Sequence, residues 1–263
     1  MAIKPRVFVT VRDTKRAARA KSPYIDGCFE AMNVIGSVYI NSQIPSSSGL
    51  GSSAAVTVAT LSAINDEFGL NKTREDIADM AFEIEKKVQK GRASPTDTTV
   101  STYGGIILIA GGSRRRLPPQ NMHLVVGDSL VSHSTARMVE QVADLKKASP
   151  KIVDPVLDAI EGVTMSAIHH LSNPRELGRY MNMNHHLLEV LGVGHPQLAK
   201  MVIAARGAGA FGAKITGAGG GGSMVALCPK QLKHRVAQAL EKCEARAIVT
   251  GIDTEGVRKE KNV

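Results

Sequence analysis

A glycine- and serine-rich loop at residues 45–55 constrains the fold of this chain more than any other segment. It has the sequence Pro-Ser-Ser-Ser-Gly-Leu-Gly-Ser-Ser-Ala-Ala and follows the alternating segment 37–44, which predicts a strand. The apolar segment 54–64 predicts a buried helix after it. A glycine-rich loop between a strand and a helix is typical of anion-binding sites, because the free N–H groups of the first helical turn point at the anion.

Each residue type in this loop suits a phosphate group. Gly49 and Gly51 have no Cβ atom, so the backbone can approach an anion closely. Ser52 and Ser53 offer hydroxyls to phosphate or to a phosphate-bound Mg²⁺ ion. The alternative is a serine that only caps a buried helix. A cap needs one serine and this loop has five, so we favour a phosphate-binding loop.

The composition indicates a globular cytoplasmic protein. The chain of 263 residues is long enough for one large domain or two modest ones, and 43% of it is hydrophobic. Its three cysteines are widely spaced and form no C-x-x-C pair, so we expect reduced thiols rather than a disulfide or a zinc site. We expect neither a signal peptide nor a transmembrane span, because no stretch is sufficiently apolar.

The net charge of +9 raises nucleic-acid binding as a possible function. Against it, Lys and Arg are dispersed and only 3% of residues are aromatic, too few to stack bases. The densest basic run, Arg114–Arg116, lies between the strand-like segments 105–110 and 123–127, and we predict an exposed connecting loop there. Small polyanionic substrates also explain the charge, so we expect no nucleic-acid partner.

The remaining pattern predicts an α+β protein with a largely helical second half. Thr73 and Asp76 have the spacing of a capping box at the start of an amphipathic helix. Proline near the first helical position marks most of the later helices, which are predicted at 134–148, after Ser149-Pro150, after Asn173-Pro174, at 195–210 and at 231–244. Short strands are predicted at 214–216, 224–228 and 246–250. We place a domain boundary near residue 130, which gives domains 1–130 and 131–263.

Two further segments suggest chemistry. The segment 217–222 has five glycines in six residues, and each glycine weakens a helix or strand interior by about 0.5–1 kcal/mol. It is therefore either a flexible hairpin turn or a backbone surface packed against a ligand or the phosphate loop. In the loop 91–97, the Asp97 carboxylate can accept a hydroxyl proton, and Glu85 on the preceding helix can hold Mg²⁺. For Asp97 alone, a residue that merely turns the chain is the more ordinary interpretation.

Together these segments resemble the GHMP kinases, the family named for galactokinase, homoserine kinase, mevalonate kinase and phosphomevalonate kinase. Four motifs in the family's order carry the resemblance, which begins near residue 36, and they are most similar to those of the mevalonate kinases: 45–55, 83–105, 183–195 and 214–222. The resemblance implies a two-domain α+β fold with the active site in the cleft between the domains. The N-terminal domain is implied to be of the ribosomal-protein-S5 type and the C-terminal domain helical and ferredoxin-like.

The resemblance also implies a reaction, transfer of a phosphoryl group from ATP to mevalonate with Mg²⁺, and a homodimer. Another GHMP kinase activity, on phosphomevalonate or homoserine, and a nucleotide-binding protein without catalysis are the alternatives. By position, Asp97 is implied to be catalytic, and Ser53 and Glu85 to be metal ligands. The residues implied to bind ATP are Pro45, Ser48, Gly49, Leu50, Gly51, Ser52 and Ser53, and those implied to bind the substrate are Thr135, Gly217, Ala218 and Gly219.

The family's first motif does not occur in this sequence. That motif is an N-terminal strand with Pro-Gly-Lys, followed by Gly-Glu-His, and its lysine neutralises the transferred phosphate. Lys4, Lys15 and Lys21 do not lie in such a context, and Val7–Val11 alternates like the strand that follows the motif. We therefore expect an incomplete N-terminal domain, an open sheet edge and weak activity.

Overall fold

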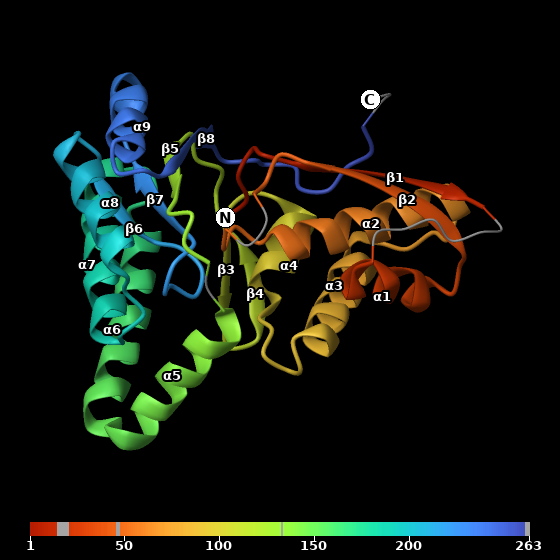
Figure 1. Ribbon diagram of the computed structural model, residues 1–263, viewed down its shortest axis with the longest axis horizontal. Helices are drawn as coiled ribbons and strands as arrows, with labels where there is room; N and C mark the ends of the chain where they lie inside the picture. The colour runs from red at the N-terminus through yellow and green to blue at the C-terminus, as the bar shows by residue number, and fades with distance from the viewer. Residues whose placement is uncertain (15–20, 46–47, 133, 261–263) are drawn as a thin grey trace. The chain divides into compact units, whose positions relative to one another are not determined.

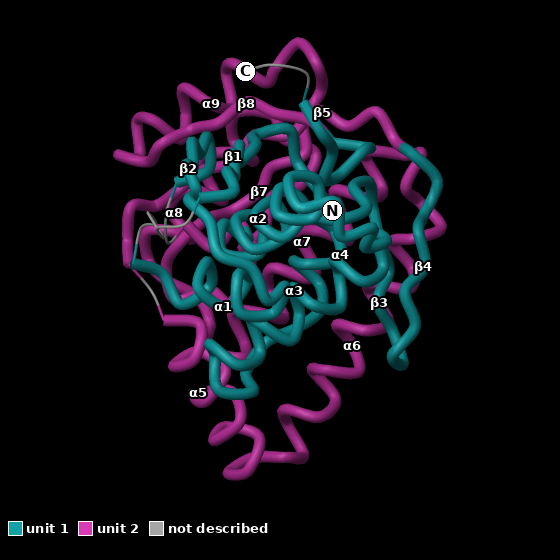
Figure 2. Tube along the Cα trace, turned by 90° about the vertical axis from the view of Figure 1, so that its right-hand side faces the viewer, with its two compact units in different colours: residues 1–46, 51–119, 252–263 teal, residues 47–50, 120–251 magenta. Residues whose placement is uncertain are grey.

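The computed structural model describes residues 1–14, 21–45, 48–132 and 134–260, and the chain divides into two compact units (Figure 1, Figure 2). Unit 1 comprises residues 1–46, 51–119 and 252–263, and unit 2 comprises residues 47–50 and 120–251. Both units are therefore discontinuous in the sequence. The predicted domains, residues 1–130 and 131–263, are each continuous in the sequence, and these ranges stay a prediction.

Unit 1 contains two antiparallel strand pairs and a group of helices. One pair joins β1 (Val7–Asp13) to β2 (Gly36–Ser42), with Val7 opposite Ser42, and the other joins β3 (Ile107–Ala110) to β4 (Ser113–Arg116). The helices are α1 (Pro23–Met32), α2 (Ser52–Phe68), α3 (Arg74–Val88) and α4 (Pro95–Tyr103).

The core of unit 1 forms around α2, which is buried on most of its faces, as its apolar sequence predicts. Val58, Leu61 and Ile64 of α2 pack in one cluster with Phe29 of α1 and Ile77 of α3. Full burial of each such side chain contributes about 1.5–3 kcal/mol to folding. This packing fixes α2, and with it the position of the helix N-terminus that carries Ser52 and Ser53.

The start of α3 confirms the predicted capping box. The Thr73 hydroxyl accepts a hydrogen bond from the Asp76 N–H at 3.1 Å, and the Asp76 carboxylate accepts one from the Thr73 N–H at 2.8 Å. Two otherwise free donors at the helix start are thereby satisfied.

Two local predictions in unit 1 are wrong. Arg114–Arg116 form the exposed strand β4 rather than a loop, because pairing with β3 supplies the backbone hydrogen bonds. Asp97 lies in the first turn of α4 rather than in a loop, because Ser94 caps that helix and Pro95 takes its first position.

Unit 2 is built on a four-stranded antiparallel sheet in the order β6-β7-β5-β8. The strands are β5 (His123–Asp128), β6 (Gly212–Ile215), β7 (Ser223–Leu227) and β8 (Arg246–Gly251). The helices are α5 (Thr135–Ala148), α6 (Pro150–Ile168), α7 (Pro174–Val190), α8 (Pro196–Gly207) and α9 (Lys233–Glu241), with a short 3₁₀ helix, η1 (Lys230–Leu232), before α9.

Helices α8 and α9 provide the core of unit 2 against the sheet. Leu198 and Met201 of α8 and Leu240 of α9 are fully buried with Val125 and Met224 of the strands. The predicted helix starts are confirmed, since Ser134, Ser149, Asn173 and His195 are the N-cap residues of α5, α6, α7 and α8.

Cys28, Cys228 and Cys243 are free and buried. None of the described helices has the length and apolarity needed to cross a membrane.

Candidate functional site

The N-terminus of α2 lies beside a carboxylate of α3. Gly51 is the N-cap of α2 and has φ +70°, a left-handed conformation that glycine adopts without steric cost. Two residues further on, the Ser53 hydroxyl donates a hydrogen bond of 2.7 Å to Glu85 Oε1. Glu85 is only 3% exposed. The structure thus brings together the two side chains that the sequence suggested as metal ligands.

Asp97 lies at the same helix N-terminus. A Cβ atom at Gly51 would be 3.2 Å from Asp97 Cγ and 3.4 Å from Asp97 Oδ2. Because Gly51 has no side chain, the carboxyl group of Asp97 can lie next to its backbone. Within unit 1, three helices contribute one polar side chain each to this group: Ser53 from α2, Glu85 from α3 and Asp97 from α4.

The protein raises the pKa of both carboxyl groups above their ordinary values. Burial raises the pKa of Glu85, the hydrogen bond from Ser53 opposes the change, and the charge of Asp97 adds to it. Although Asp97 is exposed, desolvation by the surrounding protein raises its pKa as well, against the opposing positive charge of the amino terminus. A bound cation would offset the cost of ionising both groups.

The donor set of this group suits a hard cation such as Mg²⁺. Hydroxyl and carboxylate oxygens are the ligands that Mg²⁺ prefers, and the ion usually takes the rest of its shell from water and substrate phosphates. Within the ranges that the structure describes, no three or more His, Cys, Asp or Glu side chains gather as a metal site. Ser53 and Glu85 therefore fit an Mg²⁺ ion that arrives with a phosphate ligand, rather than a metal held by protein alone.

The glycine loop 217–222 packs against the tip of the serine loop within unit 2. A Cβ atom at Gly217 would be 3.1 Å from the carbonyl oxygen of Gly49. The Ser223 hydroxyl, which directly follows the glycines, donates a hydrogen bond of 2.6 Å to the carbonyl oxygen of Ser48. Of the interpretations offered by the sequence, this contact favours a backbone surface packed against the serine loop.

Other glycines of this loop are packed against protein. A Cβ atom at Gly219 would be 2.2 Å from the carbonyl oxygen of Val193, which lies between α7 and α8. At Gly220 it would be 2.4 Å from Met138 Sδ, one turn after Thr135 at the start of α5. The loop therefore contacts the neighbourhood of Thr135, an exposed residue. Substrate binding by Thr135, Gly217, Ala218 and Gly219 stays a prediction.

The residues predicted to bind nucleotide fall in both units. Pro45, Gly51, Ser52 and Ser53 belong to unit 1, and Ser48, Gly49 and Leu50 belong to unit 2. Ser46 and Ser47, also in this loop, lie outside the described residues.

Sequence reasoning missed two polar residues next to the glycine loop. Ser223 lies between the predicted glycine loop 217–222 and the predicted strand 224–228 and was given no role, although a serine after five glycines is a signal for a loop anchor. Lys214 precedes the loop on β6, its Nζ donates to the carbonyl oxygen of Ile215 at 2.7 Å, and burial lowers its pKa to about 8.

A phosphate-type loop at a helix N-terminus, with a hydroxyl and two carboxylates beside it, is the arrangement expected of a small-molecule kinase. Comparison with known protein families agrees. Residues 14–105 match the model of the GHMP kinases N-terminal domain, and residues 164–245 match the model of the GHMP kinases C-terminal domain. The chain belongs to the GHMP kinase family, and as such it is a kinase that uses ATP.

Curated relatives include archaeal mevalonate kinases. The enzyme of Thermococcus sibiricus is 42% identical over 230 residues, which is 85% of this chain and 68% of that protein. The enzyme of Pyrococcus horikoshii is 40% identical over 230 residues, with the same coverage of 85% and 68%. This chain thus spans about two thirds of the length of these relatives.

Solved structures confirm the predicted α+β GHMP kinase fold. The mevalonate kinase of Methanococcus jannaschii superposes with a TM-score of 0.78 at 25% identity, covering 96% of this chain and 90% of that one. The L. major mevalonate kinase in complex with R-mevalonate gives a TM-score of 0.83 at 24% identity, covering 96% and 87%.

Proposed function

We propose that this protein transfers the γ-phosphoryl group of ATP to the hydroxyl of mevalonate, giving 5-phosphomevalonate for isoprenoid biosynthesis. The observation that carries the proposal is the identity of about 40% with mevalonate kinases across 85% of the chain. The geometry at the start of α2 supports the same class of reaction, since phosphoryl transfer needs positioning and charge neutralisation more than covalent chemistry.

In this proposal, the serine loop binds the phosphates of ATP. The free N–H groups at the start of α2 point at the anion with the helix dipole behind them. Gly51 adopts a left-handed φ at the N-cap and adds no side chain of its own at that end of the helix. The bond from Ser223 to Ser48 holds the loop at Ser48 without any nucleotide.

Ser53 and Glu85 are the proposed ligands of Mg²⁺. When bound, the ion would supply positive charge that neutralises the phosphate oxygens. The two residues supply oxygen ligands whose positions α2 and α3 fix through the hydrogen bond of 2.7 Å between them. The raised pKa of Glu85 supports this role, because a buried carboxyl group without a cation is costly to ionise.

Asp97 is the proposed proton acceptor. As the hydroxyl oxygen of mevalonate bonds to the γ-phosphorus and the bond to ADP breaks, the hydroxyl proton passes to the Asp97 carboxylate. A raised pKa makes Asp97 a stronger base than an ordinary aspartate. Its exposure at the surface of α4 leaves the carboxylate accessible to a substrate.

The test is a coupled ADP-release assay with mevalonate, phosphomevalonate, homoserine and galactose as acceptors. We expect turnover with mevalonate and at most a few per cent of that rate with the others. Preference for another acceptor would favour a different GHMP kinase activity, and tight ATP binding without turnover would favour a nucleotide-binding protein. A homodimer and a cytoplasmic location are further proposals; light scattering on the same sample checks the first.

A further inference from the structure

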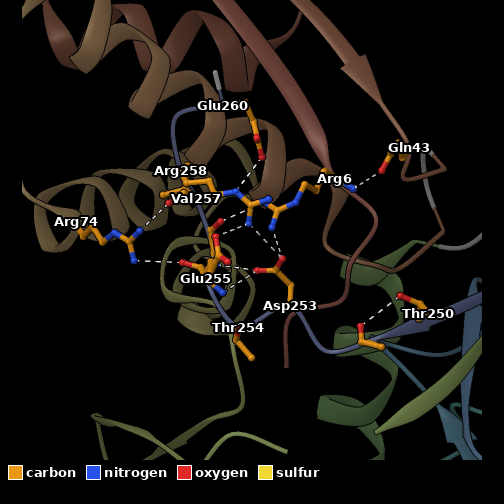
Figure 3. Close-up of polar contacts among 12 residues, drawn as sticks. Arg6, Gln43, Arg74, Thr250, Asp253, Thr254, Glu255, Val257, Arg258 and Glu260 are labelled. Carbon is orange, nitrogen blue, oxygen red and sulfur yellow. Dashed lines mark hydrogen bonds and ion pairs between the residues drawn. The ribbon is translucent and has the colours of Figure 1, made fainter. Parts of the chain in front are cut away.

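A segment near the C-terminus, residues 252–257, crosses the end of α4 in unit 1, and we call it the strap (Figure 3). Apart from a single bridge between Ile252 and Ile3, it forms neither helix nor strand. Its four consecutive carbonyl groups from 254 to 257 each accept a hydrogen bond from an arginine: Arg116 to Thr254, Arg74 to Glu255 and Val257, and Arg6 to Gly256.

The carboxylate of Asp253 closes the strap on itself. Its Oδ1 atom accepts hydrogen bonds from the N–H groups of Glu255 at 3.0 Å and Gly256 at 2.8 Å. Its Oδ2 atom pairs with Arg6. An irregular segment usually leaves backbone groups to water. Here arginines from elsewhere in unit 1 pair with four carbonyl groups, and the strap's own Asp253 pairs with two N–H groups. The strap is therefore fixed in place.

What the strap fixes is the C-terminal end of α4. The Val257 N–H donates to the carbonyl oxygen of Thr102 at 3.2 Å, and the Gly105 N–H donates to that of Asp253 at 2.6 Å. A Cβ atom at Gly256, where φ is +71°, would be 2.4 Å from the carbonyl oxygen of Thr102. The backbones of strap and helix are thus in direct contact, with no space for a side chain.

The other end of α4 carries Asp97. A helix rises about 1.5 Å per residue, so Asp97 lies roughly 7.5 Å from Thr102 along the axis. Over that length a helix moves as one body, and a displacement of about 1 Å in a reacting group can cost about 100-fold in rate. A shift at Thr102 therefore changes the position of the Asp97 carboxylate beside Gly51.

We infer that the strap is a positioning element for the reaction, in which Asp253 and Gly256 hold α4 and through it the carboxylate of Asp97. The inference rests on the proposed role of Asp97 as proton acceptor. If it is correct, the reaction also depends on Asp253 and Gly256, which follow Asp97 in the sequence by more than 150 positions.

The test compares Gly256→Ala and Asp253→Asn with Glu260→Gln as the matched control. Gly256→Ala pushes on Thr102, and Asp253→Asn keeps the side-chain shape while weakening the bond to Arg6. Glu260→Gln removes an ion pair with Arg258 that does not involve α4. We expect kcat to fall at least tenfold in the first two variants, with the KM for ATP within threefold of the parent. In the control variant, kcat and the KM for ATP should both stay within twofold of the parent.

Two readouts separate positioning from loss of stability. The first is a fall in kcat at a nearly unchanged KM for ATP. The second is hydrogen exchange: amides 99–103 of α4 should exchange faster in both strap variants than in the control, whether or not the protein is active.

The outcomes are distinguishable. If the parent does not turn over mevalonate, the proposed function fails, and hydrogen exchange alone decides on the strap. Rates in both strap variants that match the control, or unchanged protection of α4, would overturn the inference. A fall in melting temperature with kcat unchanged would overturn it too.

Discussion

The buried hydroxyl of Ser223 donates a hydrogen bond of 2.6 Å to the carbonyl oxygen of Ser48, a residue 175 positions earlier in the chain. Ser223 is fully buried and Ser48 is 2% exposed, so water does not replace this bond when it is lost. The bond ties the strand after the glycine loop to the tip of the serine loop. We therefore expect Ser223 to support the proposed phosphate loop through its backbone.

Ser223→Ala should weaken ATP binding without abolishing it. The change removes one neutral hydrogen bond to the carbonyl of Ser48, worth about 1 kcal/mol, so we expect the KM for ATP to rise several-fold. Steady-state kinetics at saturating mevalonate measures this. Ser113→Ala is the control, since the Ser113 hydroxyl also donates to a backbone carbonyl, that of Ala110 at 2.8 Å, but on an exposed strand. Equal kinetics in the two variants would contradict a role for Ser223 in ordering the loop.

Asp97→Asn should lower kcat by at least 100-fold while the Kd for ATP changes less than threefold. The amide keeps the shape of the side chain but cannot accept the hydroxyl proton. Single-turnover kinetics gives the first value and equilibrium titration the second. Asp79→Asn, which changes an exposed carboxylate paired with Arg114, should leave both unchanged. A rate within tenfold of the parent would remove Asp97 from the catalytic role.

Glu85→Gln should make the protein more stable and less active. A carboxyl whose pKa is raised in the folded state binds its proton more tightly there, so its ionisation destabilises the fold. Parent stability is therefore fully retained below the ordinary pKa of 4.5 and decreases as the pH rises through the folded-state pKa. Glutamine, which does not ionise, avoids this loss.

The measurement is the unfolding midpoint of parent and Glu85→Gln from pH 4 to 8 without Mg²⁺. We expect the variant to melt higher at pH 7, by a few degrees if the gain is about 1 kcal/mol, and the two curves to converge near pH 4. With Mg²⁺ and ATP present, kcat should be at least tenfold lower. A variant less stable than the parent at pH 7 would show that the ionised carboxylate stabilises the fold.

Gly219→Ala should destabilise unit 2, because its Cβ atom would be 2.2 Å from the carbonyl oxygen of Val193 and the φ of Gly219 is +79°. We expect a loss of about 1–3 kcal/mol, in the range of overpacked and strained sites. Gly162→Ala is the control, because nothing lies within 4 Å of a Cβ atom there and the residue is inside α6. Alanine in a helix should add about 0.5–1 kcal/mol. Denaturant unfolding of both variants measures the difference, and a Gly219→Ala protein as stable as the parent would contradict the packing described above.

Features coded by neighbouring residues could be predicted from the sequence. Thr73 and Asp76 make a capping box within a single turn, and Pro150 and Pro174 mark helix starts by their own fixed φ. The serine loop was predicted for the same reason, since the strand, the glycines and the helix that define it are contiguous.

Features that depend on residues far apart in the sequence could not be predicted from it. The arginines of β4 form a strand only because β3 pairs with them, and charge patterning alone favoured a loop. Helix α1 was not predicted, and its Phe29 is held by side chains from α2 and α3. The contact of Gly217 with Gly49 was one of several interpretations of a glycine run, and only the fold selects among them.

Both units are assembled from pieces far apart in the chain, and this bears on how the protein is made. During synthesis, residues 1–119 leave the ribosome first, but unit 1 also needs the strap, so its last contacts wait until the segment after Gly251 has emerged. By then the whole sheet of unit 2 is available to fold. Unit 1 therefore completes its fold last, although most of it is translated first, and until then it remains a partly folded intermediate.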